Sequence, residues 1–212
     1  MTMIAIDGPA AAGKGTLARR LAAHLGFDYL DTGLIYRAAG MGLVRTGQDP
    51  ANTDLATQQA ERLSPTDLAA DDLRSDVAAQ AASKVAAIPG VRAALLDFQR
   101  RFAQQPPGGK GAVLDGRDIG TVVCPQAKIK LFVTASLEKR AERRLKELQD
   151  RGLPAIHSDV LADMRERDQR DSSRSVAPLT AAEDAFVLDS SELDADQAFA
   201  LALTVVQDRM RD

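Results

Sequence analysis

The sequence has few of the features that mark secreted or membrane-spanning proteins. It contains one cysteine, Cys124, which excludes an intramolecular disulfide and fits a reducing compartment. No apolar run is long enough to cross a bilayer. The N-terminal residues lead directly into a strand pattern and show neither the basic region nor the small-residue cleavage site of a signal peptide. We therefore expect a cytoplasmic protein with no membrane partner.

Aromatic side chains and positive charge are also scarce. Aromatic residues make up 4% of the chain, tryptophan is absent, and the formal net charge is -3. A nucleic-acid partner is not expected, because such binding relies on base stacking and on a basic surface. Hydrophobic residues make up 45% of the 212 residues, enough for one α/β domain with a small inserted subdomain. No helical pattern has a long second apolar face, so we expect a monomer.

Short apolar runs alternate with helical patterns along the whole chain. The run 3–6 is ended by Gly8 and Pro9, as is typical of a buried parallel strand. This alternation predicts a doubly wound α/β fold with a five-stranded parallel sheet. The other expected strands are 27–30, 112–114, 129–133 and 186–189. The expected helices are 17–25, 34–44, 55–63, 73–87, 91–103, 137–151, 160–171 and 194–210, with Pro89-Gly90 separating the fourth from the fifth.

An anion-binding loop lies between the first strand and the first helix. Its glycines allow backbone N–H groups to turn toward an anion, and the helix N-terminus adds unpaired donors and the positive end of its dipole. Lys14 is expected to bridge the β- and γ-phosphates of ATP during phosphoryl transfer. The position between strand and helix predicts a P-loop that binds ATP. The loop consists of Gly8, Pro9, Ala10, Ala11, Ala12, Gly13, Lys14, Gly15 and Thr16.

One position departs from the general P-loop pattern. The residue after the lysine is usually Ser or Thr, whose hydroxyl binds Mg²⁺, but here it is Gly15, with Thr16 next. We therefore expect Mg²⁺ to be held less directly, through substrate phosphates, water and Asp115, which ends the third strand.

Two other classes of P-loop protein fit the sequence poorly. A GTPase needs an Asn-Lys-x-Asp loop, whereas the only asparagine is Asn52, followed by threonine. Motor and AAA-type ATPases usually have a second carboxylate beside the strand-end aspartate, whereas Gly116 follows Asp115. A small-molecule kinase remains. Catalytic bases are scarce, which suits a phosphate acceptor, because a phosphate monoester is already a nucleophile at neutral pH.

Positive charge gathers in the segment 137–174, which carries eight arginines. Kinases of this size close over their substrates to exclude water, and a closing segment must supply cations. Arg140 and Arg144 lie four residues apart and share one helix face. Carboxylates are interspersed, so the pattern also fits two solvated surface helices. We expect about three of the arginines to contact phosphate.

Further motifs resemble those of a known family. They are Asp-Thr-Gly-Leu-Ile-Tyr-Arg at 31–37, Asp-Gly-Arg-Asp-Ile-Gly-Thr-Val-Val at 115–123, Arg-Asp-Gln-Arg-Asp-Ser-Ser-Arg at 167–174 and Val-Ala-Pro-Leu at 176–179. Together with the Gly-Lys-Gly-Thr form of the P-loop, they resemble the bacterial cytidylate (CMP/dCMP) kinases over nearly the whole chain and in the same order.

The resemblance implies transfer of the γ-phosphoryl group of ATP to CMP or dCMP, giving CDP or dCDP and ADP. We expect Lys14, Arg117, Arg140, Arg144 and Arg174 to stabilise the transferred charge. The resemblance also implies that the loop 175–179 lies against the adenine of ATP. The residues implied in acceptor binding are Arg37, Arg117 and Arg174 for the phosphate, Ser83, Arg92 and Asp118 for the base, Thr32 and Tyr36 for the shape of the pocket, and Arg167 and Asp171 for the sugar.

We expect one P-loop kinase domain in three parts. The parts are a core (1–45, 104–136 and 175–212), a nucleoside-monophosphate-binding insert at about 46–103 and a lid at about 137–174. Family members often carry a longer insert with a small antiparallel sheet. Here the segment 46–72 is short and poor in β-branched and aromatic residues, so no such sheet is expected. Two alternatives stay open: a kinase for another nucleoside monophosphate, and a non-catalytic switch that binds ATP.

Overall fold

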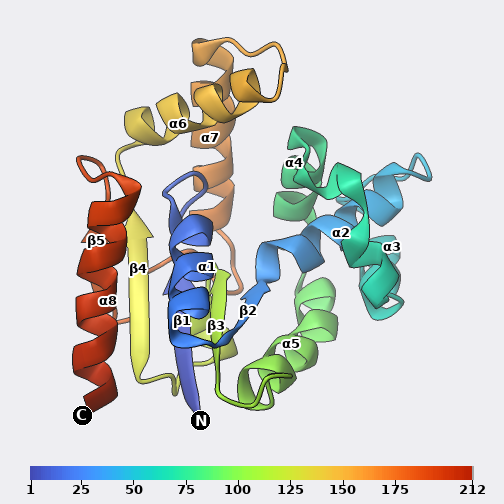
Figure 1. Cartoon of the computed structure of the whole chain (residues 1–212). Helices are drawn as coiled ribbons and strands as arrows, with labels where there is room; N and C mark the ends of the chain where they lie inside the picture. The colour runs from blue at the N-terminus through green and yellow to red at the C-terminus, as the bar shows by residue number, and fades with distance from the viewer. Residues whose placement is uncertain (212) are drawn as a thin grey trace.

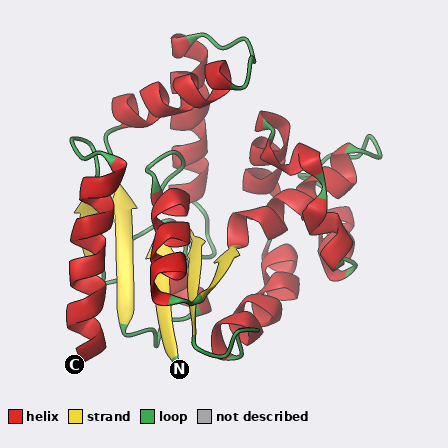
Figure 2. Ribbon diagram, in the orientation of Figure 1, coloured by secondary structure: helices red, strands yellow, loops and turns green. Residues whose placement is uncertain are grey.

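The protein is built on a five-stranded parallel sheet (Figures 1 and 2). The structure, a computed structural model, describes residues 1–211. The strands lie in the order β2-β3-β1-β4-β5, and every pair is parallel. The predicted fold class is therefore confirmed. The strands are β1 (Thr2–Asp7), β2 (Asp28–Asp31), β3 (Gly111–Gly116), β4 (Ile129–Thr134) and β5 (Phe186–Asp189).

Helices cover both faces of this sheet. On one face, α1 (Lys14–Leu25) and α8 (Ala195–Arg211) pack against alternate residues of β1 and β4, among them Ile4, Ile6 and Leu131, which are at most 1% exposed. On the other face, α5 (Pro89–Gln104) and the single π-helical turn η3 (Ile119–Val123) cover Ala5 and Leu114. Successive side chains along each strand point to opposite faces of the sheet, so they contribute to two separate apolar cores.

Two helical arms extend beyond the sheet (Figure 1). The first consists of α2 (Thr32–Val44), α3 (Thr53–Glu61), α4 (Asp76–Val85) and α5, which share their own apolar core. Within it α2 and α4 lie very close, since a Cβ at Gly40 would be 2.7 Å from the Cβ of Ala81. The second arm consists of α6 (Leu137–Asp150) and α7 (His157–Ser172), which pack through Ala141, Leu148 and Met164.

Two predicted helix boundaries were wrong. The expected helix 73–87 is divided: the 3-10 turn η2 (Asp71–Arg74) precedes α4, because Ser75 is extended and its hydroxyl accepts a hydrogen bond from Ala78 N at 3.1 Å. The dipeptide Pro89-Gly90 does not lie between helices but begins α5. Proline suits the first helical position, where no backbone N–H is needed.

The segment 46–72 contains α3 and the 3-10 turn η1 (Pro65–Ala69), and no strand is formed between residues 46 and 72. Within residues 1–211, no helix has the length and apolar character needed to cross a membrane.

Gly8 fixes the path of the chain as it leaves β1. Its φ is +148°, and a Cβ there would lie 2.0 Å from the carbonyl oxygen of Val133. Gly8→Ala is therefore expected to lower the free energy of unfolding by about 3 kcal/mol or more, through backbone strain and steric overlap. Gly47→Ala is the matched control, because Gly47 also has a positive φ, +71°, but no atom within 4 Å of the added Cβ. Urea denaturation measures the free energy of unfolding of both variants. Equal losses of this free energy in Gly8→Ala and Gly47→Ala would contradict the prediction.

Candidate active site

A cleft of about 930 Å³ lies between the two helical arms and the loop that follows β1. This edge, beyond the carboxyl ends of the parallel strands, is where open α/β sheets bind ligands. Residues of the P-loop, of the start of α2, of α4, of the segment after β3 and of α6 and α7 all contribute to its lining.

The P-loop presents free backbone donors to the cleft. Helix α1 begins at Lys14, no side chain of the described residues caps its N-terminus, and no acidic residue lies in its first turn. Ala11 and Gly13 both have positive φ values, 58° and 91°, which bend the loop around the helix end. An anion would be stabilised there by unpaired N–H groups and by the helix dipole. Of the nine predicted loop residues, Ala10, Ala11, Gly13, Lys14, Gly15 and Thr16 line the cleft, whereas Gly8, Pro9 and Ala12 are buried behind it.

Asp115 lies directly beside Gly15. A Cβ at Gly15 would be 3.1 Å from Asp115 Oδ2, so the glycine leaves room for this carboxylate. Tyr29 Oη donates a hydrogen bond to the same oxygen at 2.9 Å. Burial raises the pKa of Asp115, and the nearby Lys14 ammonium opposes that rise. Asp115 is 5% exposed and is absent from the lining of the cleft.

These residues fit a metal ion held mainly by the substrate. Among residues 1–211, no group of three or more His, Cys, Asp or Glu side chains could hold a metal ion. A cation beside Asp115 would therefore take its other ligands from phosphate oxygens and water, which is the usual behaviour of Mg²⁺.

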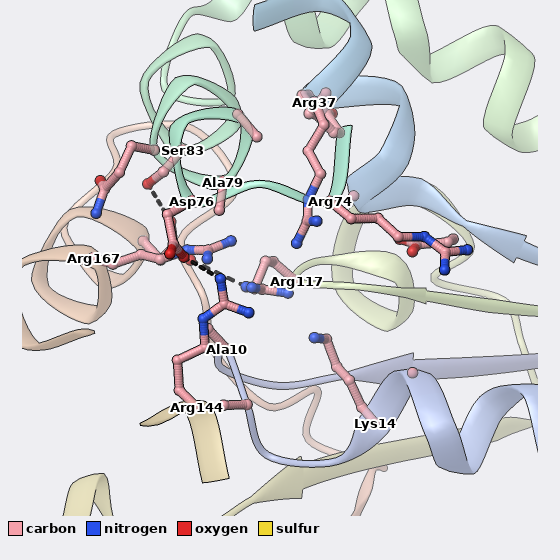
Figure 3. Close-up of a pocket in the computed structure, with 18 of the residues that line it drawn as sticks. Ala10, Lys14, Arg37, Arg74, Asp76, Ala79, Ser83, Arg117, Arg144 and Arg167 are labelled. Carbon is pink, nitrogen blue, oxygen red and sulfur yellow. Dashed lines mark hydrogen bonds and ion pairs between the residues drawn. The ribbon is translucent and has the colours of Figure 1, made fainter. Parts of the chain in front are cut away.

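Lysine and arginine side chains from α1, α2, η2, α5, α6 and α7 line the cleft, together with Arg117 and Arg174 from the segments after β3 and α7. Figure 3 shows the nitrogen ends of Lys14, Arg37 and Arg117 directed toward the same space. Burial, with Arg117 beside it, lowers the pKa of Lys14 to about 7. Burial and Arg117 likewise lower the pKa of Arg167 to about 9. The buried Nε atoms of Arg167 and Arg174 have no hydrogen-bond partner among residues 1–211. Crowded cations with unused donors create a site that favours a multiply charged anion.

Asp171 is the counter-charge of this cluster. Its side chain is 3% exposed and accepts hydrogen bonds from Arg117 Nε at 3.1 Å and from Ser83 Oγ at 3.1 Å, and it is also paired with Arg174. Burial would raise the pKa of Asp171, but Arg117 and Arg174 lower it below its usual value. Helix α7 thereby orients two arginines and one hydroxyl that the sequence assigned to substrate binding.

A buried ion pair joins Arg92 of α5 to Asp118, the residue before η3. Their side chains are 8% and 6% exposed, and the guanidinium carbon of Arg92 lies 5.8 Å from the centre of the Tyr36 ring. Burial raises the pKa of Asp118, and Arg92 opposes that rise. Arg92, Asp118 and Tyr36 all line the cleft, as does Thr32, whose hydroxyl donates to Asp115 O at 2.7 Å. An aromatic ring beside paired donors and acceptors suits a planar heterocycle.

The two arginines of α6 have different surroundings. Arg144 lines the cleft and pairs with Asp76 of α4 and with Glu147. Arg140 is buried outside the lining: Nη1 donates to Asp168 at 3.1 Å and Nε donates to Ala135 O at 3.0 Å. Its Nη1 also lies 3.4 Å from Ala10 O, so Arg140 joins α6 and α7 to the P-loop.

A second cavity of about 250 Å³ adjoins the P-loop on the side of α8. Its lining is mostly apolar and includes Leu17, Val133, Leu193 and Ala198, with Arg143 at its border with the cleft. Arg143 Nη1 donates to Ser190 Oγ at 3.0 Å. The loop 175–179, which was expected to lie against adenine, contributes no residue to the lining of either cavity.

Several residues near the site were not identified from the sequence. Arg74 and Asp76 line the cleft, but they come from a segment without a recognisable motif. Asp7 is buried at the end of β1 and accepts hydrogen bonds from two backbone N–H groups. The signal for Asp7 was present, because it is a carboxylate that ends an otherwise apolar strand directly before the P-loop, and in the sheet it lies opposite Gly116, next to Asp115.

The sheet, the P-loop after its first strand and a second group of cations facing that loop define the class of P-loop kinases that act on a phosphorylated acceptor. Comparisons with known proteins agree. The family model described as cytidylate kinase matches residues 4–208. Two curated cytidylate kinases are similar over most of their length. That of Paramagnetospirillum magneticum is 78% identical and covers 97% of both chains, and that of Rhodospirillum rubrum is 59% identical and covers 96% of both.

The chain belongs to the cytidylate kinase family. A solved structure of an uncharacterized protein from Eubacterium ventriosum is similar in fold alone, with a TM-score of 0.56, 13% identity, and coverage of 98% of this chain and 99% of that one.

Lys14 is expected to gain a proton when ATP binds above pH 7. With a pKa of about 7 it is mostly neutral at pH 8 in the free protein, and a triphosphate beside it would raise that pKa. Binding at pH 8 should then take up protons, which calorimetry without metal detects as a dependence of the binding enthalpy on the ionisation enthalpy of the buffer. Lys14→Arg stays charged and should show no uptake; the same uptake in this variant would assign the proton elsewhere.

Proposed function

We propose that this protein transfers the γ-phosphoryl group of ATP to CMP or dCMP, giving CDP or dCDP and ADP. Membership of the cytidylate kinase family supports the reaction. The observation that carries the assignment to this site is a cleft lined by two chemically different groups. One is the P-loop with its free N–H groups, and the other is the buried Arg92–Asp118 pair beside Tyr36.

The acceptor base lies against Arg92 and Asp118. Cytosine presents an amino donor at C4 and acceptors at N3 and O2, so a carboxylate suits the first and an arginine suits the others. Uracil has a carbonyl at C4, and Asp118 would then face a second acceptor in a site that excludes water. Tyr36 and Thr32 border this space, and the Ser83–Asp171 contact holds α4 against α7 beside it.

The phosphates meet in the middle of the cleft. Arg37, Arg117 and Arg174 hold the acceptor phosphate, while Arg167, with Asp171, faces the sugar. Lys14 and Arg144 approach from the P-loop and from α6, where charge moves onto the leaving oxygen of the donor. No general base is required, because the attacking phosphate oxygen is already ionised at neutral pH.

Magnesium bound between the donor phosphates would neutralise charge and align the transferred group. Asp115, oriented by Tyr29, would hold a water of that ion, and Gly15 leaves the space for it.

The donor adenine occupies the 250 Å³ cavity beside α8 rather than the region of the loop 175–179. This cavity is mostly apolar, begins at Gly13 and Thr16 of the P-loop, and has Arg143 at its edge. An apolar slot with a guanidinium at its rim suits a purine ring, because stacking and cation–π attraction tolerate a planar aromatic ligand.

The three parts of the domain then have distinct tasks. The core carries the P-loop, the insert at about 46–103 supplies Ser83 and Arg92 to the acceptor base, and the lid at about 137–174 supplies Arg144 and Arg167 over the phosphates. Contacts already join insert and lid, through Arg144 with Asp76 and through Arg151 Nη1, which donates to Arg74 O at 2.9 Å. Approach of these parts excludes water from the transfer.

Two alternatives are distinguished by one assay. ADP release with ATP and Mg²⁺ is measured with CMP, dCMP, UMP, AMP and GMP. Turnover with CMP and dCMP and little with the others is expected. Preference for another nucleotide would overturn the assignment of the base site, and ATP binding without any turnover would favour a non-catalytic switch.

Asp118→Ala is expected to lower kcat/KM for CMP by about 10- to 100-fold, because one hydrogen bond to a charged group is lost and Arg92 is left unpaired. Turnover of UMP should change less, so the CMP/UMP ratio falls by at least about tenfold. Asp208→Ala is the control, because it removes an exposed carboxylate of α8 outside the cleft. A CMP/UMP ratio equal to that of the unaltered protein would remove Asp118 from base recognition.

Ala198→Phe should raise KM for ATP by about tenfold or more and leave KM for CMP almost unchanged, because the added ring fills the cavity assigned to adenine. Leu201→Phe, on the exposed side of α8, is the matched control. If both KM values respond equally to Ala198→Phe, adenine does not bind in this cavity.

A further inference from the structure

Asp7 is a buried carboxylate without an ion pair in the described chain, and none of the roles above involves it. It ends β1 and is 5% exposed. Its Oδ1 accepts a hydrogen bond from Ile119 N at 2.7 Å, and its Oδ2 accepts one from Gly120 N at 2.7 Å. Burial raises the pKa of Asp7 to about 7, and these two bonds oppose the rise. Burying an unpaired carboxylate lowers the stability of the fold, so its presence here indicates that its hydrogen bonds have a function.

The two N–H groups belong to the first turn of η3, which begins at the base-facing carboxylate. Asp118 is the N-cap of this turn, and its carbonyl accepts from Val122 N at 2.9 Å and from Val123 N at 3.1 Å. The first N–H groups of a helical turn have no partner within it. Asp7, at the end of β1, supplies the acceptor oxygens for these N–H groups and thereby fixes the start of η3.

The far end of η3 is held separately. Arg100 of α5 donates to Val123 O at 3.2 Å and to Val122 O at 3.1 Å. A π-helical turn is a rare and intrinsically weak conformation, so it persists only when its surroundings hold it. With the far end fixed by α5, Asp7 holds the backbone directly after Asp118, while Arg92 pairs with the Asp118 side chain.

We propose that Asp7 is a positioning residue for acceptor recognition, which acts through η3 to hold Asp118 against Arg92 and the cytosine base. The proposal rests on the base-reading role given to Asp118 above. Asp7 is the residue immediately before the P-loop. The strand β1 therefore positions the P-loop at the donor site and, through Asp7 and η3, also positions Asp118 at the acceptor site.

Steady-state kinetics of Asp7→Asn test the proposal. The amide keeps the size of the side chain but places an NH₂ group against one of the two backbone N–H donors. The expected result is a rise of about tenfold in KM for CMP, a CMP/UMP ratio lowered by a similar factor, and KM for ATP changed by less than about twofold. Val206→Ala, a buried truncation in α8, is the control for stability loss alone and should leave all three quantities near their original values.

A double-mutant cycle separates positioning from simple stabilisation. If Asp7 acts through Asp118, adding Asp7→Asn to Asp118→Ala should change the CMP/UMP ratio no further. An unchanged CMP/UMP ratio and CMP KM in Asp7→Asn, or effects that add fully in the double variant, would overturn the proposal. An unchanged ratio in Asp118→Ala alone would instead overturn the base-reading role itself.

A second variant covers the case in which Asp7→Asn does not fold. A Cβ at Gly120 would lie 3.2 Å from Lys130 Cδ, at the flexible part of that side chain, and 3.3 Å from Asp7 Oδ2, so Gly120→Ala crowds the Asp7 contact while keeping the carboxylate. It should raise KM for CMP selectively, by a smaller factor. A KM for CMP equal to that of the unaltered protein would count against the proposal.

Discussion

The confinement of positive charge is the constraint on which the rest of the structure depends. Lys14, Arg37, Arg117, Arg167 and Arg174 face one cleft, and their mutual repulsion and partial burial must be offset. Asp171 of α7 offsets part of this repulsion, and other carboxylates of the two arms offset more of it. The proposed substrate phosphates would supply the negative charge that is still lacking. Cations gathered in advance need little reorganisation when the reaction moves charge among the phosphate oxygens. The arrangement of two helical arms around a parallel sheet is what allows cations from separate parts of the chain to meet.

Much of the fold and of the P-loop could be predicted because the determining residues are contiguous. The apolar run before Gly8, the glycines and the helix after Lys14 follow one another, and the structure places them as strand, loop and helix. Helix boundaries were less predictable: whether Pro89 precedes or begins α5 depends on how α5 packs against α3 and the sheet.

The partners of individual site residues could not be predicted, because they come from distant segments. Nothing local marks Asp168 rather than a neighbouring carboxylate as the partner of Arg140, since the pairing is set by how α6 crosses α7. Asp76 meets Arg144 only because two arms approach each other. Arg92 and Asp118 were singled out by resemblance to a family, whereas their direct pairing is a property of the folded chain.

The pairing of Arg144 with Asp76 affects how nucleotide binding responds to ionic strength. If phosphate binds Arg144 as proposed above, it displaces a carboxylate of the protein rather than a loosely associated counter-ion, and the same holds for the arginines paired with Asp171. Binding would then exchange one ion pair for another, so fewer small ions would be released than the number of arginine contacts suggests. Added salt then weakens binding less than it would for an uncompensated basic surface. A cell can change its ionic composition considerably while such a site keeps its affinity for nucleotides.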